Sequence, residues 1–313
     1  MQVIKPILVE PSTAIVATTL TDSTTPWSGA TSYALNDIVK RNNRKYISLV
    51  AGNLAHTPPT AATYWDDPIT DTYWAFYGPD NIAAMFDNKG NTSSTGTTTF
   101  NSEWFLSSLV ESVAVLNVSA VTVQLIVRDN STVGTIVYDE TKGLSVVTIG
   151  DWYDYFFLAV TTDISQLIFD GIPPPVLTHS NYYKLVVTGA TGATVSVGSV
   201  FCGSKYNIGL TQYDAKAGIT DYSKKITDEY GNVTITKRAF SKKLTANVEV
   251  ANADLNRVQA LMYTLRATPC VWIGSDDTRL QEALILYGFY QDFSTSISYP
   301  NHSLMSLEIS GLT

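Results

Sequence analysis

Five aromatic residues fall within the stretch 26–67, and they are the residues of this chain best suited to ligand binding. They are Trp27, Tyr33, Tyr46, Tyr64 and Trp65. A flat ring can stack on the apolar face of a sugar, while nearby amide and hydroxyl groups bind the sugar hydroxyls. The same rings can instead form the core of a small unit, which needs large side chains to bury enough surface. We expect most of them to be core and one or two to be exposed.

The residues that we predict to bind carbohydrate are Trp27, Tyr33, Tyr64 and Trp65. Tyr46 lies in the strand-like run KYISL, and we expect it to pack in the core together with Trp27. Tyr64 and Trp65 are neighbours, and consecutive side chains of a strand face opposite sides. One of these two rings can therefore be exposed as a platform for a sugar.

Motifs of catalysis are absent from the sequence. The chain has no Gly-x-Ser-x-Gly, no His-Glu-x-x-His and no phosphate-binding loop, and its three histidines (His56, His179 and His302) are isolated. Three carboxylate pairs occur: Asp151 with Asp154, Asp228 with Glu229, and Asp276 with Asp277. A glycosidase needs two carboxylates at a set separation across a cleft, which a sequence cannot show. We predict a protein that is not an enzyme and that needs no cofactor.

Acidic loops offer possible oxygen ligands for calcium. They contain Asp66, Asp67 and Asp71 in one place and Asp276 and Asp277 in another. Their spacing matches no defined calcium-binding loop. We therefore predict solvated turn residues here and no metal site.

Composition restricts the classes of fold and partner. The chain has 313 residues, of which 45% are hydrophobic and 15% charged, with a net charge of −8. This length predicts two or three domains with a substantial core, and the net charge argues against specific nucleic-acid binding. A basic cluster from Lys40 to Lys45 is typical of a hairpin turn. The two cysteines, Cys202 and Cys270, are far apart in sequence and predict buried structural thiols.

The segment 1–25 is expected to form an N-terminal arm, either extended or a single strand. Pro6, Glu10 and Pro11 interrupt its apolar residues, so it does not have the pattern of a signal peptide. No apolar run approaches the length of a membrane span. We therefore expect synthesis in a cytoplasm and no insertion into a membrane.

Alternating apolar and polar residues predict strands over most of the remaining chain. In AVTVQLIVRD, Val123, Leu125 and Val127 alternate with polar residues, as in a half-buried strand. Similar runs separated by turn residues predict a jelly-roll-like β-sandwich over 69–205. The fold class is therefore mainly β.

The segment 206–313 predicts a split β-barrel with one packed helix. KLTANVEVAN alternates as a strand, and it is followed by a helical pattern over 252–267. One stripe of that helix is apolar, and Pro269 must lie beyond its end. The paired lysines and arginines at 237–238 and 242–243 predict a solvated strand edge, and a second possibility is contact with an acidic neighbour or with DNA.

The segment 26–68 resembles the small chitinase-type carbohydrate-binding module. The likeness rests on the order Trp27, Tyr33, Asp37-Ile38-Val39, Lys45-Tyr46, Pro58 and Trp65. Asn36 stands where that family has glycine. Asparagine tolerates the left-handed backbone better than most residues, so we expect the turn to persist. The resemblance implies binding of a glycan through exposed aromatic rings.

The rest of the chain resembles baseplate and distal tail proteins of tailed bacteriophages. The likeness is spread over 70–313 and rests on NIAAMFDNKGNTSS, on IGLTQYDAKAGITDYSKKITDEYGNVTITKRAF and on ILYGFYQDFSTSISYPNHSLMSLEISGL. It implies a virion component of the tail tip that assembles in the host cytoplasm as a homo-oligomeric ring. The implied partners are the tail tube, hub and fibres, and host surface polysaccharide.

Two other functions remain open at this point. In a purely structural tail protein, the aromatic module would pack against a neighbouring tail protein or fibre. In a polysaccharide-degrading enzyme, the module would hold the substrate for one of the carboxylate pairs.

Overall fold

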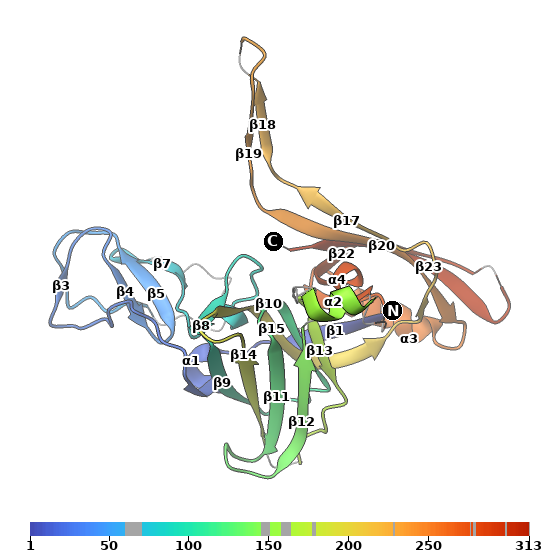
Figure 1. Ribbon diagram of the computed structural model, residues 1–313, viewed down its shortest axis with the longest axis horizontal. Coiled ribbons are helices and arrows are strands. Elements are labelled where there is room, and N and C mark those ends of the chain that lie inside the picture. Colours follow the sequence, from blue (N-terminus) through green and yellow to red (C-terminus); the bar gives the residue numbers. More distant parts are fainter. Residues whose placement is uncertain are drawn as a thin grey trace. The chain divides into compact units, whose positions relative to one another are not determined.

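The computed structural model (Figure 1) describes residues 1–59, 71–144, 151–157, 164–176, 180–227, 229–275, 277, 280–297 and 299–312. The fold is mainly β, as the sequence predicts. The contacts group the chain into two compact units, 7–201 and a second unit made of 1–6 with 202–313. The domain boundaries expected after residues 25, 68 and 205 stay predictions.

An aromatic module forms one part of the unit 7–201. Its strands are β3 (Ser32–Tyr33), β4 (Ile38–Arg41), β5 (Arg44–Ser48), β6 (Asn53–Leu54) and β7 (Trp74–Pro79). They form a three-stranded sheet, β4-β5-β7, and a two-stranded sheet, β3-β6. The hairpin between β4 and β5 turns through Asn42 and Asn43, whose φ angles are 53° and 59°. Positive φ at both central residues is the requirement of a type I′ hairpin turn, and asparagine accepts it more easily than most residues.

The other part of this unit is a β-sandwich. Its strands are β2 (Ile15–Thr18), β8 (Ser94–Thr97), β9 (Thr99–Leu106), β10 (Ser112–Ser119), β11 (Thr122–Asp129), β12 (Ile136–Gly143), β13 (Leu167–Asp170), β14 (Asn181–Thr188) and β15 (Thr194–Asn207). One sheet has the order β12-β11-β14-β9-β2; the other contains β13-β10-β15, and β8 also pairs with β15. Short helical segments are α1 (Pro11–Ala14), η1 (Ala84–Phe86) and α2 (Trp152–Phe157).

The core of the sandwich follows the alternation in the sequence. Val123, Leu125 and Val127 of β11 are buried, which confirms the predicted inner face of that strand. Large rings fill the same core, where Trp104 of β9 stacks on Tyr183 of β14 with ring centroids 5.8 Å apart. The sandwich therefore has a packed interior that can support an attached module.

The second unit is a curled sheet with a packed helix. Its strands are β1 (Gln2–Ile7), β16 (Leu210–Thr211), β17 (Lys216–Asp221), β18 (Lys224–Thr227), β19 (Val233–Thr236), β20 (Phe240–Ala251), β21 (Cys270–Ile273), β22 (Ile285–Ser296) and β23 (His302–Gly311), and its helices are α3 (Leu255–Thr264) and α4 (Gln281–Leu284). The order is β1-β21-β22-β23-β20-β16. β1 comes from the segment expected as an N-terminal arm and pairs with β21. The sequence predicts a split β-barrel with one packed helix here, and the structure has a curled half-barrel sheet with α3 packed on it, which agrees with the barrel class.

Helix α3 lies within the segment 252–267 that the sequence predicts as helical. Its buried residues Val258 and Met262 join Leu265 in the core of the curled sheet. Helix α3 ends at Thr264, before Pro269 as predicted. Ala267, between the helix end and Pro269, has a φ of 56°. Cys202 and Cys270 are buried free thiols.

Candidate functional site

Aromatic rings form the core of the small module. Tyr33, Tyr46 and Trp74 are buried, and Tyr33 meets Trp74 edge to face with ring centroids 5.4 Å apart. The burial of Tyr46 confirms the expectation from KYISL. Trp74 belongs to β7, which follows the segment expected as the module and pairs with β5. A unit of this size therefore uses most of its aromatic rings for packing.

Tyr33, one of the predicted sugar-binding residues, lies buried in the module core. Only 6% of it is exposed. Its hydroxyl accepts a hydrogen bond from the Ser28 backbone N–H (2.7 Å) and donates to the Ser28 carbonyl oxygen (3.3 Å). This bond pair fixes the loop that carries Trp27. A ring buried in this way has no free face for a sugar.

Trp27 is half-buried and packs against the module core. The guanidinium of Arg41 lies over its ring, 5.5 Å from the centroid, as in a cation–π contact. Its Nε1 atom is buried without a hydrogen-bond partner among the residues that the structure describes. Trp27 thus offers part of one ring at the surface, and this ring is already in contact with a cation.

Tyr64 and Trp65 lie outside the described residues, and their role as a sugar platform stays a prediction. Both flanks of their segment are held on the module. Before it, the Tyr46 hydroxyl donates to the Pro59 carbonyl oxygen (2.7 Å). After it, the Asp71 carboxylate accepts from the backbone N–H of Trp74 (2.6 Å). Pro59 and Asp71, which flank this segment, are therefore held at the aromatic core.

A stacked pair that the sequence analysis missed lies beside this core. The rings of His56 and Tyr73 are parallel within 8°, with centroids 3.4 Å apart. His56 Nδ1 lies 3.0 Å from Asn53 Oδ1, and the His56 carbonyl oxygen accepts from Trp74 Nε1 (2.8 Å). His56 looks isolated in the sequence, because its partner is 17 residues away along the chain. No sequence signal indicated this pair.

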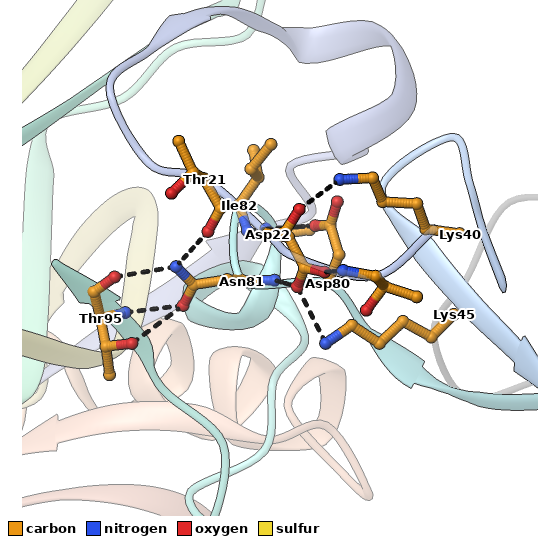
Figure 2. A network of polar contacts seen from close by, with 10 residues as sticks. Thr21, Asp22, Lys40, Lys45, Asp80, Asn81, Ile82 and Thr95 are labelled. Atoms are coloured by element: carbon orange, nitrogen blue, oxygen red, sulfur yellow. Dashed lines mark hydrogen bonds and ion pairs between the residues drawn. The ribbon is translucent and has the colours of Figure 1, made fainter. Parts of the chain in front are cut away.

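The module is attached to the sandwich through Asp22 (Figure 2). Lys45 makes an ion pair with the Asp22 carboxylate at 2.8 Å, and Lys40 donates to the Asp22 carbonyl oxygen at 2.7 Å. Lys40 and Lys45 are directly opposite each other on β4 and β5. Two like charges in that position repel each other, and the Asp22 carboxylate paired with Lys45 and the Asp22 carbonyl oxygen bound by Lys40 offset the repulsion. We call these three residues the Asp22 clamp.

The clamp continues into the sandwich through Asn81 (Figure 2). The Asn81 backbone N–H donates to the Asp22 carboxylate at 2.8 Å. The Asn81 side chain donates to the carbonyl oxygens of Thr21 and Thr95 at 3.0 and 2.8 Å, and it accepts from the Thr95 backbone N–H at 2.8 Å. Asn81 therefore links strand β8, through Thr95, to Asp22, which in turn contacts Lys40 of β4 and Lys45 of β5.

Two carboxyl groups at this junction have opposite pKa shifts. Burial opposes ionisation of Asp22, but the bonds from Lys45, Thr24 and Asn81 outweigh it and hold the pKa of Asp22 well below its usual range. Burial raises the pKa of Asp80, and the negative charge of Asp22 nearby adds to this rise. Asp22 is thus the ionised centre of the clamp.

A second attachment lies at Arg44. Its guanidinium Nη2 contacts both carboxylate oxygens of Glu10, at 3.1 and 3.2 Å, and Arg44 is buried. Asn43 next to it donates to the Pro11 carbonyl oxygen at 3.0 Å. The module is therefore held at two places: at the end of its hairpin, through Asn43 and Arg44, and along the two strands that flank the turn, through Lys40 and Lys45.

None of the three predicted carboxylate pairs has both side chains described, so their role stays a prediction. Asp154 has no described side chain, and Asp66, Asp67, Asp228 and Asp276 lie outside the described residues. Across the described part of the chain, no group of three or more histidine, cysteine or acidic side chains is arranged to hold a metal ion. No helix in that part is long and apolar enough to span a membrane.

Comparisons with known protein families, with curated proteins and with solved structures give no match to this chain. The arguments for its function therefore rest on the residues and geometry described above.

Proposed function

We propose that the chain is a non-enzymatic structural component of a phage tail tip or baseplate, which forms an oligomeric ring and presents a glycan-binding module for adsorption to the host surface. The observation that carries the proposal is the fixed attachment of the aromatic module to the β-sandwich through Asp22 and Arg44. A recognition module transmits force to a particle only if its attachment holds. Two buried or half-buried ion pairs provide such an attachment.

Repetition of the module around a ring would strengthen the binding of the particle to a glycan surface. A shallow aromatic site binds a sugar weakly, but several such sites on one particle bind a surface together, and the effective concentration of the later contacts is high. Symmetric assembly is also the usual state of structural parts of this kind. In this proposal the tail tube, hub and fibres are the protein partners, and host surface polysaccharide is the ligand.

Retention of the full chain on bacterial envelope polysaccharide tests the proposal. Wild type is compared with Trp65→Ala and Trp27→Ala, and Tyr77→Ala serves as the control because Tyr77 is an exposed ring outside the predicted set. We expect retention of wild type and Tyr77→Ala, and at least tenfold weaker retention of Trp65→Ala. The supernatant is assayed for released sugar, and release that depends on a carboxylate pair would favour the enzyme instead.

The purely structural tail protein is a second candidate, and the placement of Tyr33 and Trp27 favours it. Tyr33 is buried and Trp27 is half-covered, so two of the four predicted sugar contacts already serve packing. In this alternative the module packs against a neighbouring tail protein. No retention on polysaccharides by a well-folded chain, together with protection of Tyr77 in the assembled particle, would support it.

A further inference from the structure

The stacked rings of His56 and Tyr73 carry two polar atoms that are available to a ligand. One is Nε2 of His56 and the other is the hydroxyl oxygen of Tyr73, and neither makes a hydrogen bond with any residue that the structure describes. Both side chains are partly exposed. The ring pair therefore combines packing inside the aromatic module with hydrogen-bonding groups at its surface.

A buried asparagine sets the hydrogen bonding of the His56 ring. Asn53 is 1% exposed, and its side-chain Nδ2 donates to the Tyr73 carbonyl oxygen at 3.2 Å and to Ser48 Oγ at 3.0 Å. The carbonyl oxygen can only accept, so the atom that meets it is the amide nitrogen. Ser48 Oγ donates its own hydrogen to the Val50 carbonyl oxygen (2.9 Å) and can therefore accept from Asn53. The Asn53 atom that faces His56 Nδ1, 3.0 Å away, is then Oδ1.

This network decides which nitrogen of His56 carries the proton. Because Asn53 Oδ1 has no hydrogen to give, His56 Nδ1 must be the donor of their hydrogen bond. In the neutral ring Nε2 then holds a lone pair and acts as an acceptor. The Tyr73 ring restrains the imidazole further, because the two rings are parallel within 8°. His56 Nε2 is thus a hydrogen-bond acceptor in a fixed position.

The loop that carries His56 is anchored along its length. The His56 carbonyl oxygen accepts from Trp74 Nε1 at 2.8 Å, and the Pro59 carbonyl oxygen accepts from the Tyr46 hydroxyl at 2.7 Å. Asn53 is buried at the start of the loop. A group that is held in place before its ligand arrives loses little conformational entropy on binding. The anchored loop is therefore suited to a binding site.

The two polar atoms fit the hydroxyl groups of a neutral sugar. Nε2 accepts a hydrogen bond and the Tyr73 hydroxyl can donate or accept one, so neither atom requires a charged ligand. Neighbouring hydroxyls on a sugar ring offer a donor beside an acceptor. The centroids of the two protein rings are 3.4 Å apart, so a single sugar residue can reach both atoms. Small-molecule sites commonly combine aromatic rings with a few placed polar groups of this kind.

We propose that His56 Nε2 and the Tyr73 hydroxyl bind hydroxyl groups of the glycan that the aromatic module recognises. Asn53 is the positioning residue, which keeps the proton of His56 on Nδ1. This inference rests on the proposed function and names further contacts for it. The predicted stacking on Trp65 would supply apolar contact, and these two hydrogen bonds would fix the orientation of the sugar.

The position of the His56 proton is tested without any ligand. Long-range proton–nitrogen NMR spectra of the folded full chain in mildly alkaline buffer should show a protonated Nδ1 and an unprotonated Nε2, and the signals are assigned by their loss in His56→Asn. Addition of soluble fragments of bacterial envelope polysaccharide should then shift the Nε2 signal. A proton on Nε2 would overturn the inference, whatever the binding assays give.

Two variants remove one polar atom each. Tyr73→Phe keeps the ring and its stacking but has no hydroxyl. His56→Asn keeps an amide donor close to the position of Nδ1 but has no atom at the position of Nε2. The matched control is Tyr77→Phe, which removes a hydroxyl from an exposed ring outside the pair. Retention on immobilised envelope polysaccharide is measured for each variant, and circular dichroism checks its fold.

We expect the control to be retained like wild type, and Tyr73→Phe and His56→Asn to be retained at least tenfold more weakly. His56→Gln, whose amide reaches the position of Nε2, should be retained better than His56→Asn. Retention of folded Tyr73→Phe and His56→Asn at the wild-type level would overturn these contacts and leave the glycan-binding proposal standing. A folded wild-type chain that is retained on no polysaccharide would overturn both.

Discussion

Asp22 and Lys45 form an ion pair at 2.8 Å in which the Asp22 side chain is only 4% exposed. The pair links the loop before the aromatic module to the second strand of its hairpin. Asp22 also accepts backbone hydrogen bonds from Thr24 and Asn81, both at 2.8 Å. This carboxylate therefore makes one of the two attachments that hold the module, together with the Arg44–Glu10 pair.

Replacement of Asp22 by asparagine should destabilise the protein. The substituted side chain would keep the shape but lose the charge that faces Lys45, and loss of a charged hydrogen-bonded partner costs about 2 kcal/mol. The free energy of unfolding from urea titration measures this. Asp139→Asn is the control, because Asp139 is exposed, and its change should stay within about 0.5 kcal/mol. Equal stability of Asp22→Asn and wild type would show that the clamp does not hold the module.

The contribution of Asp22 should depend on pH in acid. Its pKa is lowered on folding, so its stabilisation is complete above the ordinary aspartate pKa of about 4 and is lost as the pH falls below that value. Asp80 works in the opposite direction, since its raised pKa favours the folded state as it takes up a proton. The difference in unfolding free energy between wild type and Asp22→Asn, measured at each pH, gives the contribution of the Asp22 charge alone. A difference that stays constant from neutral pH to about pH 2 would contradict this assignment.

Replacement of Arg44 by lysine should weaken the second attachment. The guanidinium of Arg44 contacts both oxygens of Glu10, whereas a lysine ammonium is a single point charge. We expect a loss of about 1–2 kcal/mol, because the group is buried. Arg257→Lys is a matched control: its ion pair with Asp254 is exposed on both sides and should contribute less than about 0.5 kcal/mol. Thermal unfolding of both variants compares them, and equal shifts would argue against a special role for the buried Arg44–Glu10 pair.

The stability of the protein should depend on whether glycine or alanine replaces Asn36. Asn36 has a φ of 69°, in the left-handed region, and the Asp37 carboxylate accepts from the Ala34 backbone N–H at 2.6 Å to close the turn. Asn36→Gly should be neutral or slightly stabilising, while Asn36→Ala should cost about 1 kcal/mol because its Cβ strains this conformation. Chemical denaturation of both variants checks this. A loss in Asn36→Gly as large as in Asn36→Ala would mean that the asparagine side chain, not the backbone, matters.

Patterns within one strand or helix could be predicted from the sequence. Val123 and Leu125 alternate with polar neighbours, and Val258 and Met262 mark one face of a helix, so local periodicity fixes which side is buried. The left-handed Asn36 was expected from the resemblance, because asparagine stands where that family has glycine and tolerates this conformation. These features depend only on residues close together in the chain.

Contacts across long stretches of sequence could not be predicted in this way. Trp74 lies beyond the segment 26–68 expected as the module, yet it belongs to β7, which pairs with β5, and to the centre of the module core. Asp22 meets Lys45 and Asn81 only after the chain has folded, and nothing in the local pattern distinguishes it from other loop aspartates. Tyr33 was a candidate sugar contact because its type fits, but its burial depends on the position of Trp74.

The proposed glycan-binding role of the module is tested most directly by one rate. This is the rate at which the full chain dissociates from a surface coated with bacterial envelope polysaccharide. Wild type should dissociate slowly, and Trp65→Ala should leave at least tenfold faster while unfolding at the same temperature. Absence of retention by a folded wild-type chain on every polysaccharide tested, or equal rates for the two proteins, would contradict a glycan-binding role for the module.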